Sequence, residues 1–247
     1  MLRRRGDVLE LIVDGVFAMD TVDTGSETAL ATLTLDRLAA GPSPARPRPA
    51  DHPDRAPGHL TPGNGSPGWR ILVGGLGLGF TAAAVLADPR VGTLEIVELQ
   101  ELLPQWLRAG LVPQAAGLLA DPRVRVTGGD VLDVVAALPA GGVDAILLDV
   151  DNGPAFLVHQ GNAEVYREPF LHRALQALAD DGVLAIWSAD PSPGLRDGLA
   201  AAGGQRVEEV LLEVARDGRQ FTYAVYLARP PAGPPAAGPT GRPGAAR

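Results

Sequence analysis

The chain has 247 residues, of which 46% are hydrophobic and 20% are charged, and its formal net charge is −8. This length suits one globular domain with appended segments, or two small domains. Cysteine is absent, which excludes disulfides, thiolate metal sites and a thiol nucleophile. The negative charge argues against general nucleic-acid binding, which depends on neutralising phosphates. No apolar run reaches the ~18–20 residues of a membrane span, so we expect a cytoplasmic protein that contacts neither nucleic acid nor membrane.

The first segment with a strand pattern lies near the N-terminus. Val8 to Val13 is an apolar run, Asp14-Gly15 favours a tight turn, and Val16 to Met19 fits the return strand. Ala29 to Leu38 fits a short helix. We therefore predict an N-terminal β-hairpin region over residues 1–40, docked on the rest of the chain because an isolated hairpin is only marginally stable.

Two segments are rich in proline and glycine and lack apolar periodicity. Residues 41–68 contain 8 prolines and 5 glycines, and residues 230–247 contain 6 and 4. Neither segment can bury enough apolar surface to offset its conformational entropy. We predict a flexible linker over 41–68 and a disordered tail over 230–247. A proline-rich ligand for a partner domain is the less favoured alternative. The main domain is expected over 69–229.

The main domain alternates between strand and helix patterns, which indicates a parallel sheet covered on both faces. The expected strands are 69–73, 93–97, 124–126, 145–148 and 183–187, and the expected helices are 80–87, 102–119 (interrupted), 131–138 and 168–178. Two last runs, 207–214 and 220–227, flank Arg216-Asp217-Gly218, which favours an antiparallel hairpin. The predicted fold class is therefore α/β, a Rossmann-like and mostly parallel sheet that ends in an antiparallel hairpin.

The loop after the first of these strands is the first candidate binding element, because ligands of open α/β sheets bind beyond the carboxyl ends of the strands. Its sequence is Gly74-Gly75-Leu76-Gly77-Leu78-Gly79. These glycines allow the backbone to approach a ligand at a helix N-terminus; a tight turn with close helix–strand packing is the alternative. Glu98 closes the next strand, 19 residues after Gly79. That spacing is typical of a carboxylate that binds ribose hydroxyls.

Two further strand ends carry acids. Asp130 follows the third strand and is expected to accept a hydrogen bond from an adenine amino group, to cap the next helix, or to do both. Asp149 and Asp151 follow the fourth strand. Two carboxylates this close can hold a cationic amine or take its proton, and crowding raises their pKa values. An Asx-type turn through Asn152-Gly153 is the structural alternative. The same long loop holds two weaker candidates for a pocket wall, His159 and Tyr166.

In this order, the motifs resemble those of the spermidine synthase (polyamine aminopropyltransferase) family. The residues that carry the resemblance are the glycine loop, Val97-Glu98, Gly129-Asp130, the stretch from Asp144 to Asp149, and Val165 to Phe170. It covers residues 8–40 and 69–229. The resemblance implies the class I S-adenosylmethionine-dependent methyltransferase fold, with a seven-stranded sheet and a small N-terminal β-domain. It also implies a small-molecule amine (polyamine) substrate and a homodimer.

The resemblance further implies roles for individual residues. The nucleoside of decarboxylated S-adenosylmethionine, or of S-adenosylmethionine itself, would be the co-substrate, with no metal involved. Its binding residues would be Gly74, Gly75, Gly77, Gly79, Glu98, Asp130 and Val131. Asp149 would deprotonate the attacking amine so that it displaces the aminopropyl group from the sulfonium. Asp151 and Tyr166 would complete the catalytic group.

Three departures from the family pattern affect positions that in the family contact the amine groups of the two substrates; we call these positions the amine half of the site. Gly77 occupies the position of the loop aspartate that grips the donor's terminal amine in the family. The second acid after the fourth strand is displaced by one residue. The N-terminal tyrosine that lines the family's polyamine pocket is replaced around Gly25-Ser26-Glu27, where only Glu27 is in register. We therefore expect an aminopropyltransferase-like enzyme, with an S-adenosylmethionine-dependent methyltransferase or a non-catalytic nucleoside-binding relative as alternatives. An NAD-binding Rossmann enzyme is a lesser rival, because the antiparallel ending argues against it.

Overall fold

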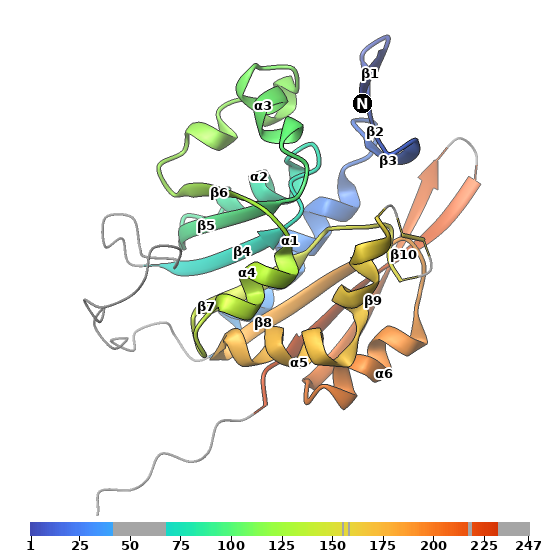
Figure 1. Ribbon diagram of the computed structural model, residues 1–247. Coiled ribbons are helices and arrows are strands. Elements are labelled where there is room, and N and C mark those ends of the chain that lie inside the picture. Colours follow the sequence, from blue (N-terminus) through green and yellow to red (C-terminus); the bar gives the residue numbers. More distant parts are fainter. Residues whose placement is uncertain (42–67, 155, 158, 217–218, 232–247) are drawn as a thin grey trace, which may run out of the picture.

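The computed structural model describes residues 1–41, 68–154, 156–157, 159–216 and 219–231. Most of the predicted linker 41–68 and of the predicted tail 230–247 lies outside these residues. The described chain forms a seven-stranded sheet and a separate three-stranded sheet, with helices on both faces of the larger one (Figure 1). None of the described helices is both long and apolar enough to cross a membrane.

The larger sheet has the strand order β6-β5-β4-β7-β8-β10-β9. Its strands are β4 (Trp69–Gly74), β5 (Val91–Glu98), β6 (Val124–Gly128), β7 (Val143–Leu148), β8 (Leu178–Ser188), β9 (Gln205–Arg216) and β10 (Arg219–Arg229). Strands β4 to β8 are parallel, and β10 is antiparallel to both β8 and β9. The predicted α/β class and antiparallel ending are confirmed. Because β4 lies between β5 and β7, the strand order reverses there, and a crevice is expected beyond its carboxyl end.

Helices cover both faces of this sheet. They are α1 (Gly25–Ala39), α2 (Phe80–Leu86), α3 (Leu102–Arg108), α4 (Val131–Ala137), α5 (Glu168–Ala177) and α6 (Pro193–Ala201). Helices α1 and α2 pack on one face, and α4, α5 and α6 pack on the other (Figure 1). In β4, Ile71 joins the core that contains Leu30 of α1, whereas Leu72 joins the core that contains Leu175 of α5. Burial of both faces explains why the strands are continuous apolar runs.

The N-terminal sheet has three strands where the sequence predicts two. Strand β1 (Leu2–Arg5) pairs with β2 (Val8–Val13), which pairs with β3 (Val16–Asp20). The arginine-rich β1 has no apolar pattern, so the sequence alone does not predict it. Its Arg3 forms an ion pair of 2.5 Å with the buried Glu10 of β2. Pairs of opposite charge across two strands stabilise their pairing.

Two further differences concern helices. Helix α6 is missing from the sequence prediction because Pro193, Gly194 and Gly198 disfavour a helix interior, but Ser192 caps its first turn. The helix expected over 102–119 ends at Arg108 and is followed by two short 3₁₀ turns. Gly110 and Gly117 lie between these pieces with φ of +71° and +81°, a backbone conformation that interrupts a right-handed helix.

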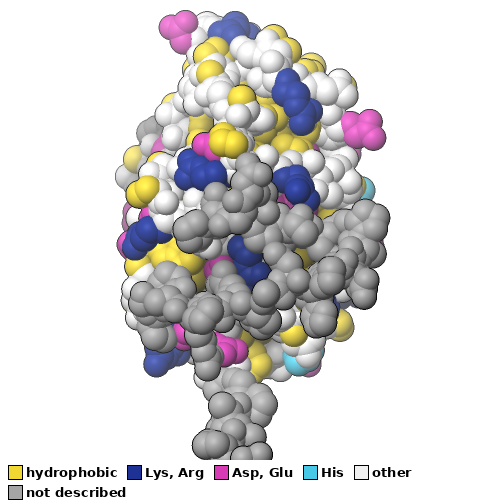
Figure 2. Space-filling model, turned by 90° about the vertical axis from the view of Figure 1, so that its left-hand side faces the viewer, with side chains coloured by type: hydrophobic (Ala, Val, Ile, Leu, Met, Phe, Trp, Pro, Cys, Tyr) yellow, Lys and Arg dark blue, Asp and Glu magenta, His cyan; other side chains and the backbone are white. Residues whose placement is uncertain are grey.

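The outer surface mixes side chains of different kinds. On the face shown in Figure 2, arginine and acidic side chains lie interspersed among apolar ones. Five carboxylates line a cleft between the carboxyl ends of the central strands and the N-terminal sheet. The fold therefore brings acids from distant parts of the sequence to one place.

Candidate active site

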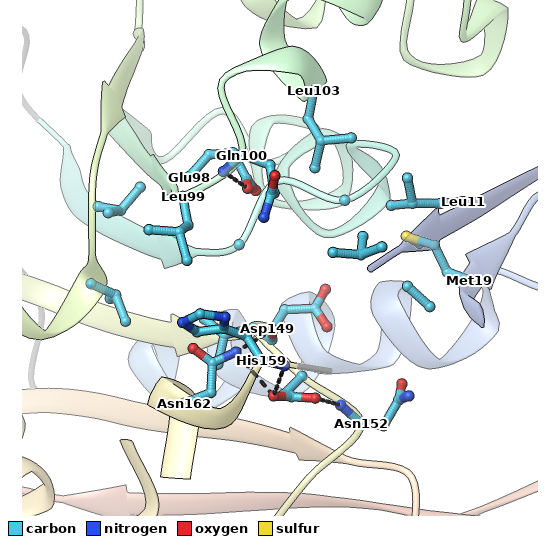
Figure 3. A pocket seen from close by; sticks show the side chains of 18 of the residues that line it. Leu11, Met19, Glu98, Leu99, Gln100, Leu103, Asp149, Asn152, His159 and Asn162 are labelled. Carbon is cyan, nitrogen blue, oxygen red and sulfur yellow. Dashed lines mark hydrogen bonds between the residues drawn. The ribbon is translucent and has the colours of Figure 1, made fainter. Parts of the chain in front are cut away.

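The cleft lies at the point where the strand order reverses. It encloses about 970 Å³ of empty space, part of it open to solvent. The N-terminal sheet, the start of α1, the glycine loop and the ends of β5, β6, β7 and β8 all contribute to its wall (Figure 3). None of the described lining residues is an arginine, and five of them carry carboxyl groups: Glu27, Glu98, Asp130, Asp149 and Asp151.

Two glycines of the loop line the cleft, and both have a positive φ. Gly75 has φ of +92°, and a Cβ atom there would lie 2.1 Å from the backbone oxygen of Asp149. Gly77 has φ of +50°, and a Cβ atom there would lie 2.7 Å from the sulfur of Met19. The same sulfur accepts a hydrogen bond from the Leu78 N–H at 3.3 Å. At Gly75 the positive φ and the close backbone oxygen require glycine. At Gly77 a side chain would displace the flexible Met19 side chain, while the φ of +50° is one that Asp14 also adopts in this chain.

The other two predicted glycines, Gly74 and Gly79, are not among the lining residues. A Cβ atom on Gly74 would lie 2.9 Å from Val131, and one on Gly79 would lie 2.9 Å from Leu118. Both positions therefore allow close packing behind the loop. The close-packing interpretation of the loop therefore applies to Gly74 and Gly79, and the ligand-approach interpretation to Gly75 and Gly77.

Glu98 is buried at the end of β5, and its carboxylate faces the glycine loop. It accepts hydrogen bonds from the Leu76 N–H at 2.7 Å and from the Gln100 N–H at 2.6 Å; Figure 3 shows the second. Burial raises the pKa of Glu98, and these backbone donors oppose the increase. The backbone N–H groups of Gly77 and Leu99 also act on this carboxylate, so Glu98 holds the glycine loop in place at the edge of the cleft.

Asp130 caps helix α4 and also lines the cleft. Its side chain accepts a hydrogen bond from the Leu132 N–H at 2.9 Å, which confirms the capping role. The neighbouring Val131, at the first position of α4, lines the cleft as well. The predicted contact of Asp130 with adenine remains a prediction.

Asp149 lies directly after β7 and is held on two sides. Its backbone N–H donates to the Gly74 oxygen at 2.8 Å, and its carboxylate accepts a hydrogen bond of 2.6 Å from the Thr81 hydroxyl. Burial raises the pKa of Asp149, while the Thr81 hydroxyl lowers it. Thr81 stands in the first turn of α2 and is itself 3% exposed. The sequence analysis did not identify Thr81, because nothing local shows that it reaches Asp149.

Glu27 lies in the cleft; the sequence placed it in register with the family's pocket tyrosine but gave it no role. Helix α1 begins at Gly25, four residues before the predicted start, which puts Glu27 in its first turn. Its side chain is 9% exposed, lines the cleft and accepts a hydrogen bond of 2.7 Å from Ser26. Burial and the charge of Asp149 together raise the pKa of Glu27 to about 7, against the lowering effect of Ser26. Two interacting carboxyls therefore share this part of the cleft.

Asp151 lines the cleft, but its carboxylate is engaged by the surrounding loop. It accepts hydrogen bonds from the Asn152 N–H at 2.8 Å, from the Asn162 side-chain amide at 2.9 Å and from the His159 N–H at 3.4 Å (Figure 3). Two of these donors lie 8 and 11 residues further along the chain, so the contacts join distant parts of the loop. Asp151 therefore orders the loop that forms one wall of the cleft.

The two aromatic candidates of the loop differ in position. His159 lines the cleft and is exposed, whereas Tyr166 is not among the lining residues. Tyr166 packs against the core that α5 covers. Burial, Asp151 and Asp149 raise its pKa above the ordinary tyrosine value.

Trp187 of β8, which the sequence analysis did not single out, does line the cleft, and its indole N–H has no hydrogen-bond partner among the described residues.

The chain resembles curated proteins over part of its length. No protein-family model matches it. It is 31% identical to putrescine N-methyltransferase 3 of Nicotiana tabacum over 125 residues, which cover 48% of this chain and 31% of that protein. It is 29% identical to the polyamine aminopropyltransferase of Mycobacterium tuberculosis over 123 residues, which cover 49% of this chain and 23% of that protein. The matched region therefore spans less than a third of these relatives.

Solved structures resemble the chain over most of its length. A spermidine synthase in complex with the transition state analogue AdoDATO gives a TM-score of 0.63 at 16% identity, covering 89% of this chain and 66% of that one. The spermidine synthase of Thermotoga maritima gives 0.65 at 17% identity, with 90% and 65% covered. A Burkholderia thailandensis N1-methyltransferase with bound S-adenosylhomocysteine gives 0.51 at 18% identity, with 85% and 80% covered. The chain thus has the spermidine synthase-like methyltransferase fold.

Proposed function

We propose that the protein transfers an alkyl group from an adenosyl sulfonium to an amine, with Asp149 as general base. The favoured group is aminopropyl. The observation that carries this proposal is that the carboxyls of Glu27 and Asp149, from α1 and the end of β7, line one cleft beside the glycine loop. Both substrates of such a reaction are cationic, and a cleft lined by carboxylates attracts them. The named transferases that resemble the chain support the same reaction class.

The donor half of the proposed site lies at the ends of β5 and β6. Gly75 and Gly77 line the cleft and carry no side chains of their own, so a ligand can approach the loop backbone. Glu98 would accept hydrogen bonds from ribose hydroxyls, and the adenine ring would rest against Asp130 and Val131; all three residues line the cleft. These residues fit an adenosyl group, because they combine an acid for the sugar with close backbone approach.

The transfer itself needs one proton acceptor next to the amine. An ammonium bound between Glu27 and Asp149 loses a proton to Asp149, and the nitrogen lone pair then forms a C–N bond to the carbon next to the sulfonium. The C–S bond breaks, its electron pair stays on sulfur, and a neutral thioether nucleoside leaves. Burial raises the pKa of Asp149, which makes its carboxylate a stronger base for this step.

Methyl transfer from S-adenosylmethionine is the second candidate, and a specific contact favours it. The family's loop aspartate, which grips the amine of the decarboxylated donor, would stand at Gly77. The Met19 side chain occupies this space, with its sulfur 2.7 Å from the place of a Cβ atom at Gly77. Without that acid, the carboxylate of S-adenosylmethionine meets no like charge at this position.

Calorimetry with the two donors and mass spectrometry of the products test the proposal. We expect binding of decarboxylated S-adenosylmethionine, and methylthioadenosine as product when an amine is added. Preference for S-adenosylmethionine, with S-adenosylhomocysteine as product, would establish the second candidate instead. Binding of neither donor would contradict both.

A further inference from the structure

Trp187 lies near the end of β8, on the strand next to that of the proposed base. In the parallel pairing of β7 with β8, Leu148 is the partner of Ile186. The residues that follow, Asp149 and Trp187, therefore lie at the same level of the sheet. Because neighbouring strands lie about 4.8 Å apart, these two residues are neighbours across the sheet.

Both side chains point to the face of the sheet that α1 and α2 cover. Leu148 and Ile186 belong to the core on the opposite face, and side chains alternate between the faces along a strand. The observed contacts agree with this alternation. Trp187 packs against the core on the α1 side, and Asp149 accepts its hydrogen bond from Thr81 of α2. An amine beside Asp149 would therefore meet the indole.

The proposed base lies between the donor half of the site and Trp187. On one side, the Asp149 N–H donates to the Gly74 oxygen of β4, the strand that leads into the glycine loop. Strand β8 lies on the other side of β7. A donor held at the glycine loop thus occupies the β4 side of Asp149, which leaves the β8 side to the amine.

Three carboxyls outside the donor half line the cleft, those of Glu27, Asp149 and Asp151. The neutral donors that bind Asp151 leave its charge in place, so all three acids attract cations to this region. Trp187 lines the same cleft. The face of an indole ring attracts an ammonium group as well, without adding a charge to the wall.

Packing holds the indole in place. The rings of Trp187 and Tyr223 of β10 meet edge to face with centroids 5.3 Å apart, and the ring of Phe221 lies 6.5 Å beyond Tyr223. An edge-to-face contact covers at most one face of the indole. The other face is available to a ligand in the cleft.

We propose that Trp187 is a substrate-binding residue whose indole face binds the ammonium group of the acceptor amine beside Asp149. This inference rests on the proposed function and adds a binding residue to its acceptor site. An ammonium held by Asp149 lies within the distance of about 6 Å over which an indole face attracts a cation. The amine loses water where it meets the ring, and the cation–π attraction offsets part of that cost.

The test measures binding of putrescine to the full chain by calorimetry, in the presence of methylthioadenosine. Trp187→Leu keeps an apolar side chain and removes the aromatic face, and Trp187→Phe keeps a weaker one. The matched control is Trp106→Leu, because Trp106 is partly buried like Trp187 but does not line the cleft.

We expect putrescine to bind about tenfold more weakly to Trp187→Leu, with Trp187→Phe between this variant and the wild type. Trp106→Leu should keep the wild-type affinity. In steady-state kinetics of Trp187→Leu, KM for the amine should rise while kcat and the affinity for the donor stay within a few-fold. Unchanged putrescine affinity in Trp187→Leu, an equal loss in Trp106→Leu, or no binding of putrescine to the wild type would overturn the inference.

Tryptophan fluorescence gives a second test that does not depend on the leucine variant remaining folded. Putrescine bound against the indole should change the emission of the wild type. Trp187→Phe should abolish this change, and Trp106→Phe should retain it. A change that persists in Trp187→Phe, or no change in the wild type, would contradict the inference.

Failure of the inference can be distinguished from failure of the proposed function. Donor binding measured without any amine tests the proposed function alone. Transfer to putrescine with an unchanged KM in Trp187→Leu leaves the proposed function intact and removes only the inference. Absence of donor binding removes both.

Discussion

At the scale of single residues, the hydrogen bond from Thr81 to Asp149 predicts how activity depends on pH. The Thr81 hydroxyl lowers the pKa of Asp149, so Thr81→Val should raise it and leave less of the base ionised at neutral pH. We expect kcat at pH 7 to fall by about 3- to 10-fold and the acidic limb of the pH–rate profile to move to higher pH. Thr81→Ser keeps the hydroxyl and should retain the wild-type profile; identical profiles for Val and wild type would contradict this role.

The raised pKa of Glu27 predicts how the free energy of unfolding depends on pH. Its pKa is raised to about 7 in the folded protein, from 4.5 for an ordinary glutamate. Between these two values the folded state binds more protons than the unfolded state, so the wild type should lose stability as the pH rises from 5 to 8. Relative to Glu27→Gln, we expect a loss of roughly 1–3 kcal/mol in urea unfolding.

The matched control for Glu27 is Glu101, which is exposed at the start of α3. Glu101→Gln makes the same chemical change without removing a buried carboxyl. It should follow the wild-type dependence on pH. If Glu27→Gln did so too, the carboxyl at position 27 would not be held in the environment described here.

Residues differ in how much of their role the sequence reveals. Glu98 and Asp149 could be predicted, because each directly follows an apolar strand and the ends of parallel strands meet at one edge. Glu27 and Thr81 could not be given a role, because Asp149, which acts on the pKa of the first and accepts a hydrogen bond from the second, lies 122 and 68 positions further along the chain. Such long-range contacts leave no local pattern.

At the scale of elements, the glycine loop is fixed against β7 by close approach of the two backbones. Gly75→Ala would place a methyl group 2.1 Å from the Asp149 oxygen at φ of +92°. We expect roughly 2 kcal/mol or more of lost stability and weaker donor binding, measured by urea unfolding and calorimetry. Gly128→Ala is the control, because its φ is not in the left-handed region and no atom lies within 4 Å of its Cβ position. Equal effects of both changes would contradict this account.

Two substitutions of Asp130, at the start of helix α4, separate its expected roles of capping the helix and contacting adenine. Asp130→Ala removes the cap on the Leu132 N–H and should cost about 1 kcal/mol of stability. Asp130→Asn keeps a capping oxygen and should remain as stable as the wild type. If the carboxylate also contacts adenine, both variants should bind the donor several-fold more weakly in calorimetry; wild-type affinity in Asp130→Asn would leave capping as its role.

Helices and strands with an apolar repeat could be predicted from the sequence. Those that depend on ion pairs or a helix cap could not. The parallel strands are buried on both faces, so their apolar runs stand out. Strand β1 depends on ion pairs such as Arg3 with Glu10, and α6 on its cap at Ser192 and on burial of Leu195 and Leu199. Neither kind of stabilisation produces an apolar repeat.

At the scale of the whole molecule, the fold brings two halves of a site together. The donor half comes from β5, β6 and the glycine loop, which are close in sequence and could be predicted together. The amine half combines the N-terminal sheet, α1, β7 and β8, which only the tertiary structure unites. This difference explains why the sequence indicated a nucleoside site more clearly than an acceptor site.

Asp149→Asn provides the most direct measurement of the central claim, that Asp149 is the base of an alkyl transfer from an adenosyl sulfonium to an amine. The variant keeps the shape of the side chain and removes its basicity. Product formation, followed by mass spectrometry, should fall by roughly 10²- to 10⁴-fold, while calorimetry should show donor affinity within a few-fold of the wild type. Undiminished transfer by Asp149→Asn would contradict the account.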